Sequence, residues 1–375
     1  MATYYVRPDG NNSNAGTGSG TAQAWQTIGK IFAAGSVVTG GDIVYIAPGT
    51  YTESFTVLAT SPTSEVQIVG NPTASLFTGV TAGPVMLSAF NAAGTTVIYN
   101  NTFLITATSK DYYSFSNLVF ECAHTTAVSG VQFFTSRYIK FTKCIFRNES
   151  NAGSNAGAQV RLTASASTPL DATFDQCYFG PTLAFAFYMS GTSQPTDTTI
   201  IKNCYFEGQV YSAFTESITA TIINCTFASC TNAITQAGGS ANAFITVKNC
   251  LFKRCTSGIS GTSSVSGIQT YNRFVGCANT VSNIPSSVTS TTDGIFGVDS
   301  FESLLFGLNN LQPGTSYLNS PNTSFGNAHR TTFSIPHSYS VVRRGEDASA
   351  AQGVFVITAG TSSAKDHVRH LHWSP

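Results

Sequence analysis

The chain has 375 residues and a formal net charge of zero at neutral pH; 42% of its residues are hydrophobic and only 10% are charged. A surface with so few cations offers little to hold nucleic acid or an anionic membrane, so we expect neither as a partner. The first residues lack the basic and apolar pattern of a secretory leader, and no apolar run reaches membrane-spanning length, so no export signal is predicted.

The N-terminal stretch, residues 1–54, is predicted to form a cap and the first coil of the fold. It contains Tyr-Tyr-Val-Arg-Pro-Asp-Gly at 4–10, a loop rich in Gly, Ser and Asn, and Gly-Asp-Ile-Val-Tyr-Ile-Ala-Pro-Gly-Thr-Tyr at 41–51. Between them, the apolar residues from Trp25 to Phe32 have the spacing of a short helix. Such a helix would cover the open end of the first coil, because uncovered cores and sheet edges promote aggregation.

A regular repeat follows, after less regular apolar segments such as 66–69 and 96–99 that we interpret as early coils with longer loops. Its clearest copies read apolar-x-Asn-Cys-x-Phe at 201–206, 222–227 and 247–252. Weaker copies with the same offsets begin at Phe115, Phe141 and Phe174, and the pattern fades from Tyr271 to Cys277. A spacing of 21 to 25 residues between the clearest copies indicates a solenoid, with at least seven coils visible.

The repeat predicts strands. The cysteine and phenylalanine of each copy lie two residues apart, so a strand places both on one face. The copies are rich in residues that favour strands, and no helical stripe separates them. Stacking buries the apolar face of each coil, so we predict an all-β parallel β-helix with Phe206, Phe227 and Phe252 in one column. An amide ladder is predicted for Asn203, Asn224 and Asn249.

The nine cysteines are predicted to be reduced. Their number is odd, and most occupy a repeated inward strand position, where a free cysteine packs as a small hydrophobic residue. The Cys-x4-Cys pairs at 225/230 and 250/255 lack the spacing of zinc sites. We therefore expect no disulfide framework, no cofactor and no metal site in the repeat.

The C-terminal segment, residues 326–375, departs from the repeat, so the β-helix is assigned to residues 55–325. We predict that the segment is a separate cap or docking region, with a strand at 354–358. It contains five of the six histidines. His367, His370 and His372 are able to bind Zn²⁺ or Ni²⁺, but we interpret them as surface or subunit-interface residues beside the anchoring Trp373.

The motifs at 4–10 and 41–51, together with the repeats, resemble the pectate-lyase-like superfamily of right-handed parallel β-helix proteins over roughly residues 4–320. The resemblance implies that fold, with a short N-terminal capping helix. It selects no activity, because this superfamily includes lyases, hydrolases and non-enzymatic virion proteins. The chain is most similar to β-helix proteins of tailed-phage virions, and this similarity implies a homotrimer.

Enzymes of this superfamily use paired carboxylates, or calcium-binding aspartates with an arginine or lysine base. Here the acidic residues are scattered, and no Asp-x-Asp, Asp-Asp or Gly-His-Gly run occurs. Asp171 and Asp175 are the nearest pair, and we interpret them as surface carboxylates, so no catalytic residue is assigned. The acidic residues considered are Asp111, Glu121, Glu149, Asp171, Asp175, Asp197, Glu207 and Glu216.

Several tyrosines are able to stack on sugar rings, although half-buried strand residues are the interpretation that we favour. They are Tyr112, Tyr113, Tyr178, Tyr188, Tyr205 and Tyr211.

We expect a non-enzymatic structural or adsorption protein of a bacteriophage virion: a head decoration, fibre or tail spike, surface-exposed and able to bind a host glycan. It would be made in the host cytoplasm, form a homotrimer and contact other virion proteins through the C-terminal segment or the N-terminal cap. The first alternative is a polysaccharide lyase or glycoside hydrolase, including one whose site lies between subunits. A bacterial surface adhesin is the second.

Overall fold

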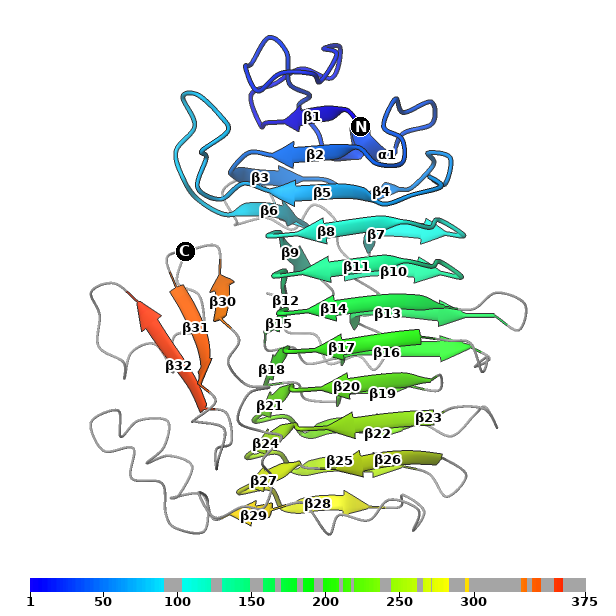
Figure 1. The fold of residues 1–375 in the computed structure, drawn as a ribbon, viewed down its shortest axis with the longest axis vertical. Helices are drawn as coiled ribbons and strands as arrows, with labels where there is room; N and C mark the ends of the chain where they lie inside the picture. Colours follow the sequence, from blue (N-terminus) through cyan, green and yellow to red (C-terminus); the bar gives the residue numbers. More distant parts are fainter. Residues whose placement is uncertain are drawn as a thin grey trace.

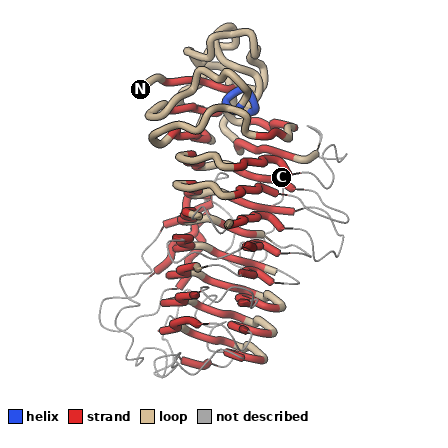
Figure 2. The backbone as a smooth tube through the Cα atoms, turned by 90° about the vertical axis from the view of Figure 1, so that its right-hand side faces the viewer, coloured by secondary structure: helices blue, strands red, loops and turns tan. Residues whose placement is uncertain are grey.

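The computed structural model shows a solenoid walled by three sheets of parallel strands, here named A, B and C (Figure 1). The chain passes from sheet A to sheet B to sheet C and then returns to sheet A one coil further on. Successive coils therefore lie as stacked rungs (Figure 2). The residues described are 1–90, 103–122, 130–148, 158–165, 170–180, 185–191, 198–208, 212–216, 219–236, 244–261, 266–270, 272–282, 294–296, 332–335, 339–344 and 354–359.

Sheet A contains β1 (Thr3–Val6), β2 (Ile43–Ile46), β5 (Val66–Gly70), β8 (Tyr113–Ser116), β11 (Ile139–Thr142), β14 (Asp171–Asp175), β17 (Thr198–Lys202), β20 (Ala220–Ile223), β23 (Phe244–Lys248) and β26 (Ser266–Thr270). Sheet B contains β3 (Gly49–Thr52), β6 (Val85–Ser88), β9 (Val119–Cys122), β12 (Ile145–Asn148), β15 (Tyr178–Phe179), β18 (Tyr205–Glu207), β21 (Thr226–Ala228), β24 (Leu251–Lys253), β27 (Arg273–Val275) and β29 (Gly294–Phe296).

Sheet C contains β4 (Phe55–Thr56), β7 (Phe103–Thr108), β10 (Gly130–Phe134), β13 (Ala158–Ala164), β16 (Phe185–Gly191), β19 (Ser212–Glu216), β22 (Asn232–Gln236), β25 (Ser257–Gly261) and β28 (Asn279–Ser282). Nearly all the described secondary structure is thus parallel strand, and the predicted parallel β-helix is confirmed. A separate antiparallel sheet holds β30 (Thr332–Ile335), β31 (Tyr339–Arg344) and β32 (Val354–Ala359). The strand predicted at 354–358 is β32, whereas the segment at 96–99 lies outside the described residues.

The core is built from columns of stacked side chains. Phe206, Phe227 and Phe252 are buried in register, with ring centroids 4.7 and 5.1 Å apart along the stack. These distances match the separation of paired strands, because each ring lies above its equivalent in the neighbouring coil. The predicted column is confirmed, and it extends in both directions. The rings in this column are Phe120, Phe146, Phe179, Phe206, Phe227, Phe252 and Phe274.

The corner between sheets A and B explains the asparagine of the repeat. Asn203, Asn224 and Asn249 have φ values of 55°, 54° and 54°, in the left-handed region that asparagine adopts more readily than most residues. The predicted ladder is found in one hydrogen bond, from Asn224 Nδ2 to Asn203 Oδ1 at 3.5 Å. Asn203 itself donates to Asp175 Oδ1 at 2.8 Å, so a carboxylate extends the column.

All nine cysteines are free, as predicted, and only Cys277 is not buried. Several of their thiols donate weak hydrogen bonds to carbonyl oxygens of their own and the preceding coil. Cys225 Sγ, for example, lies 3.3 Å from the Ile223 oxygen and 3.5 Å from the Ile201 oxygen. Burial raises the pKa of the Cys144 thiol, which favours the neutral form that fits an apolar core. No described helix has both the length and the apolar character needed to cross a membrane.

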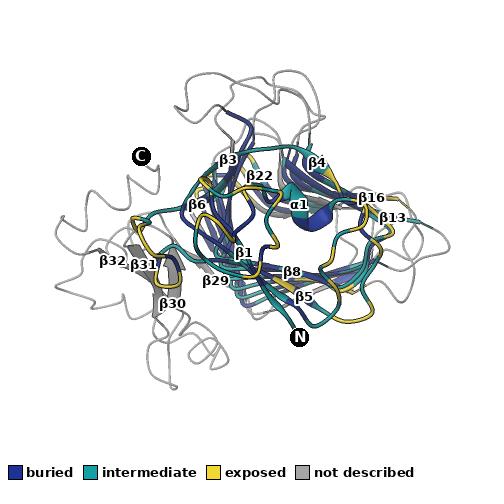
Figure 3. Ribbon diagram, turned by 90° about the horizontal axis from the view of Figure 1, so that it is seen from above, coloured by how far each residue is buried: buried dark blue, intermediate teal, exposed yellow. Residues whose placement is uncertain are grey.

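The N-terminal cap differs in detail from the prediction. Its helix, α1 (Gly29–Phe32), is only four residues long, and Trp25 precedes it in a bridge with Val6. Seen along the solenoid axis, α1 lies within the outline of the three sheets (Figure 3). The Glu53 carboxylate accepts hydrogen bonds from the backbone nitrogens of Ile28 and Gly29, both at 2.8 Å. A side chain of the first coil therefore holds the capping turn. The division of the chain at residues 54 and 325 stays a prediction.

Asp42 ties the cap to the first coil. Its carboxylate accepts hydrogen bonds from the backbone nitrogens of Ala2 at 2.6 Å and Thr39 at 2.9 Å, and from the Thr39 hydroxyl at 3.1 Å. Burial opposes the charged form, but these hydrogen bonds outweigh it and lower the pKa of Asp42. Stability from a depressed carboxyl pKa is present above the unfolded-state pKa and is lost as pH falls through the folded-state value.

We therefore expect Asp42→Asn to lower the free energy of unfolding at pH 7 by about 1–3 kcal/mol. Urea unfolding of both proteins measures the difference, which should shrink as the pH falls below about 4. A difference that does not change with pH would show that the charge of Asp42 does not contribute.

Candidate functional site

Three predicted acidic residues face partners of their own. Asp111 accepts hydrogen bonds from the Arg137 backbone nitrogen at 2.8 Å and from its Nη2 at 3.0 Å. Glu121, only 5% exposed, forms an ion pair with Arg147 and a hydrogen bond with Ser88. Glu207 accepts a hydrogen bond from the Tyr178 hydroxyl at 2.8 Å. These contacts hold the three carboxylates to neighbouring coils, and two of the three are paired with an arginine.

Asp171 and Asp175, the nearest pair in the sequence, are not brought together. Both lie on β14, where four residues span about 13 Å, which is longer than the carboxyl separation of retaining or inverting glycosidases. Burial raises the pKa of Asp171, while Asp175 lies 3.4 Å from Lys202 Nζ. The structure thus gives no support to a hydrolytic pair at these two positions.

The remaining predicted polar positions are not tested. Glu149, Asp197, the three C-terminal histidines and Trp373 lie outside the described residues, and the side chain of Glu216 on β19 is not described. Within the described part of the chain, no group of three or more His, Cys, Asp and Glu side chains has the arrangement of a metal site.

The outer face of sheet B is closed to a large ligand. Val119, Ile145 and Leu251 alternate with the inward phenylalanines and therefore point away from the core. Each is nevertheless only 2–3% exposed. A polymer running over the solenoid would find little accessible surface at these positions.

The outer face of sheet C carries a different set of side chains. Gln132, Arg161 and Tyr188 are direct register partners on β10, β13 and β16. They point outwards because the residues beside them, such as Leu162, are buried in the core. The Arg161 guanidinium carbon lies 5.5 Å from the centroid of the Tyr188 ring, which is a cation–π contact. We call these three residues the sheet C column.

One member of the sheet C column has a hydrogen-bonding group that is buried and not used. The Arg161 Nε atom lacks a partner among the described residues. Polar groups removed from water are costly unless they are paired, so this arrangement fits a surface completed by a ligand or by ordered water.

The sequence indicated only one member of the sheet C column in advance. Tyr188 was predicted from its aromatic character, but Arg161 and Gln132 were missed. The repeated Asn-Cys-x-Phe motif locates the strands of sheets A and B, but it does not fix the register of the strands in sheet C. The alternation of apolar and polar residues at 160–163 was the signal that would have placed Arg161 on an outer face.

A second surface lies at the corner between sheets C and A. The rings of Tyr112 and Tyr138 stack with centroids 4.4 Å apart and planes 17° apart, and Tyr138 is 39% exposed. Arg137, held by Asp111, lies 5.8 Å from the Tyr138 ring centroid. This corner offers an ordered aromatic edge to a ligand. The other predicted tyrosines differ: Tyr113 and Tyr178 are buried, Tyr205 is half-buried and Tyr211 lies outside the described residues.

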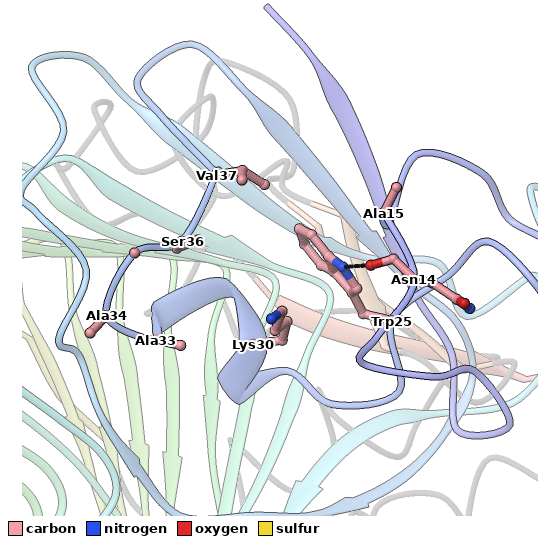
Figure 4. Close-up of a pocket in the computed structure, with 9 residues that line it drawn as sticks. Asn14, Ala15, Trp25, Lys30, Ala33, Ala34, Ser36 and Val37 are labelled. Atoms are coloured by element: carbon pink, nitrogen blue, oxygen red, sulfur yellow. Dashed lines mark hydrogen bonds between the residues drawn. The ribbon is translucent and has the colours of Figure 1, made fainter.

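The N-terminal cap contains a pocket of about 160 Å³ (Figure 4). Trp25, which is only 2% exposed, and Lys30 lie on one side of it, and residues of the following loop, including Ala33, Ala34 and Val37, line the rest. This volume is about half the lower limit for pockets that hold drug-sized ligands, roughly 300 Å³, so the pocket is too small for a polymer.

Comparisons with known proteins agree with the architecture. Residues 15–260 match a family model described as rhamnogalacturonase A/epimerase, pectate lyase-like. No curated protein matches the sequence significantly. Similar solved structures include a complex of XylC with xylose, with 8% identity over 75% of this chain and 67% of that chain and a TM-score of 0.45.

Two further solved structures are similar. Pectate lyase Pel9A is 14% identical over 88% of this chain and 86% of that chain, with a TM-score of 0.44. The deglycosylated pectin methylesterase from Aspergillus niger is 16% identical over 79% of this chain and 84% of that chain, with a TM-score of 0.36. Likenesses at this level carry no inference about activity.

Proposed function

The chain belongs to the rhamnogalacturonase A/epimerase, pectate lyase-like family, and from this premise we propose that it binds an acidic polysaccharide along the outer face of sheet C. The observation that carries the proposal is the sheet C column of Gln132, Arg161 and Tyr188. Its half-buried members, Arg161 and Tyr188, offer a cation and an aromatic ring on adjacent strands, and the nearly buried Gln132 lies beside them.

The acidic character of the ligand follows from Arg161. Arg137 and Arg147 are each paired with a carboxylate of the chain, whereas Arg161 forms no ion pair with the described residues. A guanidinium presents a planar fork of donors that matches the two oxygens of a carboxylate. The carboxylate of an acidic sugar would therefore supply the partner that Arg161 lacks, while Tyr188 packs against a sugar ring.

The extended character of the ligand follows from the rest of the same face. Outward hydroxyl groups continue along the solenoid in pairs, with Thr163 and Ser190 oxygens 3.3 Å apart and those of Ser260 and Thr235 3.4 Å apart. Because equivalent positions recur in every coil, a chain molecule lying along the axis meets similar polar groups at each step. This surface suits a polysaccharide better than a single sugar.

Loss of the guanidinium tests the proposal. We expect Arg161→Ala to weaken binding of polygalacturonate by about 10- to 100-fold, since a charged hydrogen-bonding contact contributes about 1.5–3 kcal/mol. Isothermal titration calorimetry at one fixed salt concentration measures the change. Lys202→Ala is the control, because it removes a cation that is already paired with Asp175 and that lies on sheet A.

The comparison ligand is uncharged dextran. We expect dextran to bind more weakly than polygalacturonate to the wild-type protein and to be insensitive to Arg161→Ala. Equal affinities of the wild type and Arg161→Ala for polygalacturonate would refute the role of Arg161. Equal binding of both polymers by the wild type would refute selection for an acidic glycan.

Cleavage of the bound chain is the second candidate function, because the family model is described by enzyme names. The three column residues include no carboxylate that would serve as acid or base. We therefore propose binding without cleavage, and an assay for new reducing ends after incubation with polygalacturonate separates the two functions.

We also propose adsorption of a phage particle to an acidic cell-surface glycan as the biological setting. The homotrimer and docking of residues 326–375 on other virion proteins stay predictions, supported by the sequence resemblance alone. Immunogold labelling of purified particles, together with light scattering of the isolated protein, tests both. Unlabelled particles and a monomeric protein would refute this setting without affecting the proposed glycan site.

A further inference from the structure

The outer faces of sheets A and B differ in how far they are exposed. Along sheet A, the register partners that point outwards are all half-buried or exposed: Ser114, Lys140, Thr173, Ile200, Thr221 and Thr246. Along sheet B, the outward partners are buried except at Tyr205, and we call them the sheet B column: Val119, Ile145, Tyr178, Tyr205, Thr226 and Leu251. A side chain that points out of a sheet stays accessible to water unless a second layer covers it. The outer face of sheet B is therefore covered.

The sheet B column is also the more apolar of the two. Its members are aliphatic or aromatic except for Thr226, whereas the outward column of sheet A is polar except for Ile200. A continuous apolar surface on the outside of a protein marks an interaction site, because its exposure to water is unfavourable. The layer that covers sheet B therefore needs an apolar face of its own.

The antiparallel sheet of β30–β32 has such a face. Phe333, Val341 and Ile357 are direct register partners across its three strands. Directly opposed residues of an antiparallel pair fall on the same face, and the positions between them fall on the other. The first face also takes Ile335, Tyr339 and Phe355, and the second takes Ser334, Ser340 and Thr358. A sheet that is apolar on one face must bury that face against another element.

The chain connection allows the two faces to meet. The strands β30–β32 belong to none of sheets A, B and C, and Figure 1 draws them on the side of the solenoid that carries sheet B. Residues 297–331 connect β29 with β30 and can extend over roughly 110 Å, at about 3.3 Å per residue. The six strand spacings from β29 back to β12 take only about 29 Å.

We propose that β30–β32 pack with their apolar face on the sheet B column of the same chain, as the second layer of a two-sheet sandwich. The inference is independent of the glycan site, which lies on sheet C. It also leaves the face that takes Ser334, Ser340 and Thr358 available to another protein. The C-terminal segment thus has a partner within its own chain.

A photo-crosslinker on the covered face identifies what lies over it. The full-length protein carries Tyr205→p-benzoylphenylalanine, because Tyr205 is the half-buried member of the sheet B column and the replacement keeps an aromatic ring. We expect irradiation to give a product with the mobility of a monomer, in which mass spectrometry finds the link within residues 332–359. Tyr188→p-benzoylphenylalanine, on the outer face of sheet C, is the control and should not link to those residues.

The other products contradict the proposal. A covalent dimer would show that a second copy of the chain covers sheet B. A link outside residues 332–359, or no product, would show that β30–β32 do not lie on this face.

Matched charges test the packing in the full-length chain. Trypsin cuts after arginine, and β31 contains Arg343 and Arg344. We expect Ile145→Asp to raise the rate of cleavage there by at least about tenfold, because an unpaired charge in the contact favours the open form that the protease attacks. Thr221→Asp, on the half-exposed outer face of sheet A, should change that rate by no more than about twofold.

A second pair of variants leaves the solenoid itself unchanged. Val341→Asp should act like Ile145→Asp, whereas Ser340→Asp, at the neighbouring position on the opposite face, should act like Thr221→Asp. Thermal unfolding followed by circular dichroism checks that the solenoid remains folded in all four variants. Equal cleavage rates for Val341→Asp and Ser340→Asp would overturn the proposal.

Discussion

Replacing Phe227 with aspartate is expected to leave the chain unfolded or insoluble. The Phe227 ring is completely buried between Phe206 at 4.7 Å and Phe252 at 5.1 Å. Removing a buried phenylalanine ring costs about 3–5 kcal/mol, and an unpaired carboxylate in the same space costs several more. The free energy of unfolding of a folded domain is only about 5–15 kcal/mol, so the cost of this single change is comparable to the stability of the whole fold.

The matched control introduces the same charge two residues further on. Ser229 is exposed at a corner with φ of 55°, a conformation that aspartate tolerates. We expect Ser229→Asp to change the free energy of unfolding by no more than about 0.5 kcal/mol. The soluble fraction and the thermal unfolding followed by circular dichroism compare the two variants. A Phe227→Asp protein that melted like the control would show that the phenylalanine column does not hold the solenoid together.

The phenylalanine column could be predicted because identical residues recur at fixed offsets. In a solenoid each coil buries its apolar face only against its neighbours. A residue type that recurs at equivalent positions of successive coils therefore forms a column along the axis. The corner asparagines followed from the same repetition, although only Asn224 and Asn203 join through their side chains in the hydrogen bonds described. Asp175 accepts the next hydrogen bond, from Asn203, so a carboxylate also continues the column.

The sheet C column could not be predicted in the same way. Gln132, Arg161 and Tyr188 are three different residue types, so no recurring residue identifies them as equivalent positions. Their register also depends on how many residues each corner contains. The segments between sheets B and C vary in length from coil to coil. Sequence spacing alone therefore does not say that Arg161 lies between Gln132 and Tyr188.

The short capping helix is present, but its extent differs from the predicted one for a related reason. The spacing from Trp25 to Phe32 favours a helix, but Trp25 pairs with Val6 and places its ring on Tyr4. These contacts link residues about 20 positions apart, and they override the local helical preference so that only Gly29–Phe32 remain helical.

Gly130→Ala is expected to destabilise the solenoid by about 3–5 kcal/mol, because it combines backbone strain with a steric clash. Gly130 begins β10 with φ of 108°, at an irregularity where the register with β7 shifts. A Cβ atom there would lie 2.1 Å from the Gln159 oxygen and 2.5 Å from the Ala158 oxygen of the next coil. Neither carbonyl group can move away without breaking the pairing of β10 with β13, which places Gln132 beside Arg161.

Gly79→Ala separates the two causes. Gly79 also has a positive φ, 74°, but an added Cβ atom would meet nothing within 4 Å. It therefore reports the conformational cost alone, which we expect to be about 1–2 kcal/mol. Urea unfolding should rank Gly130→Ala well below Gly79→Ala in stability. At a temperature where both variants remain folded, polygalacturonate binding should weaken only for Gly130→Ala, since only that change disturbs the strand carrying Gln132. Equal losses of stability in the two variants would mean that the close approach of β10 and β13 does not require glycine.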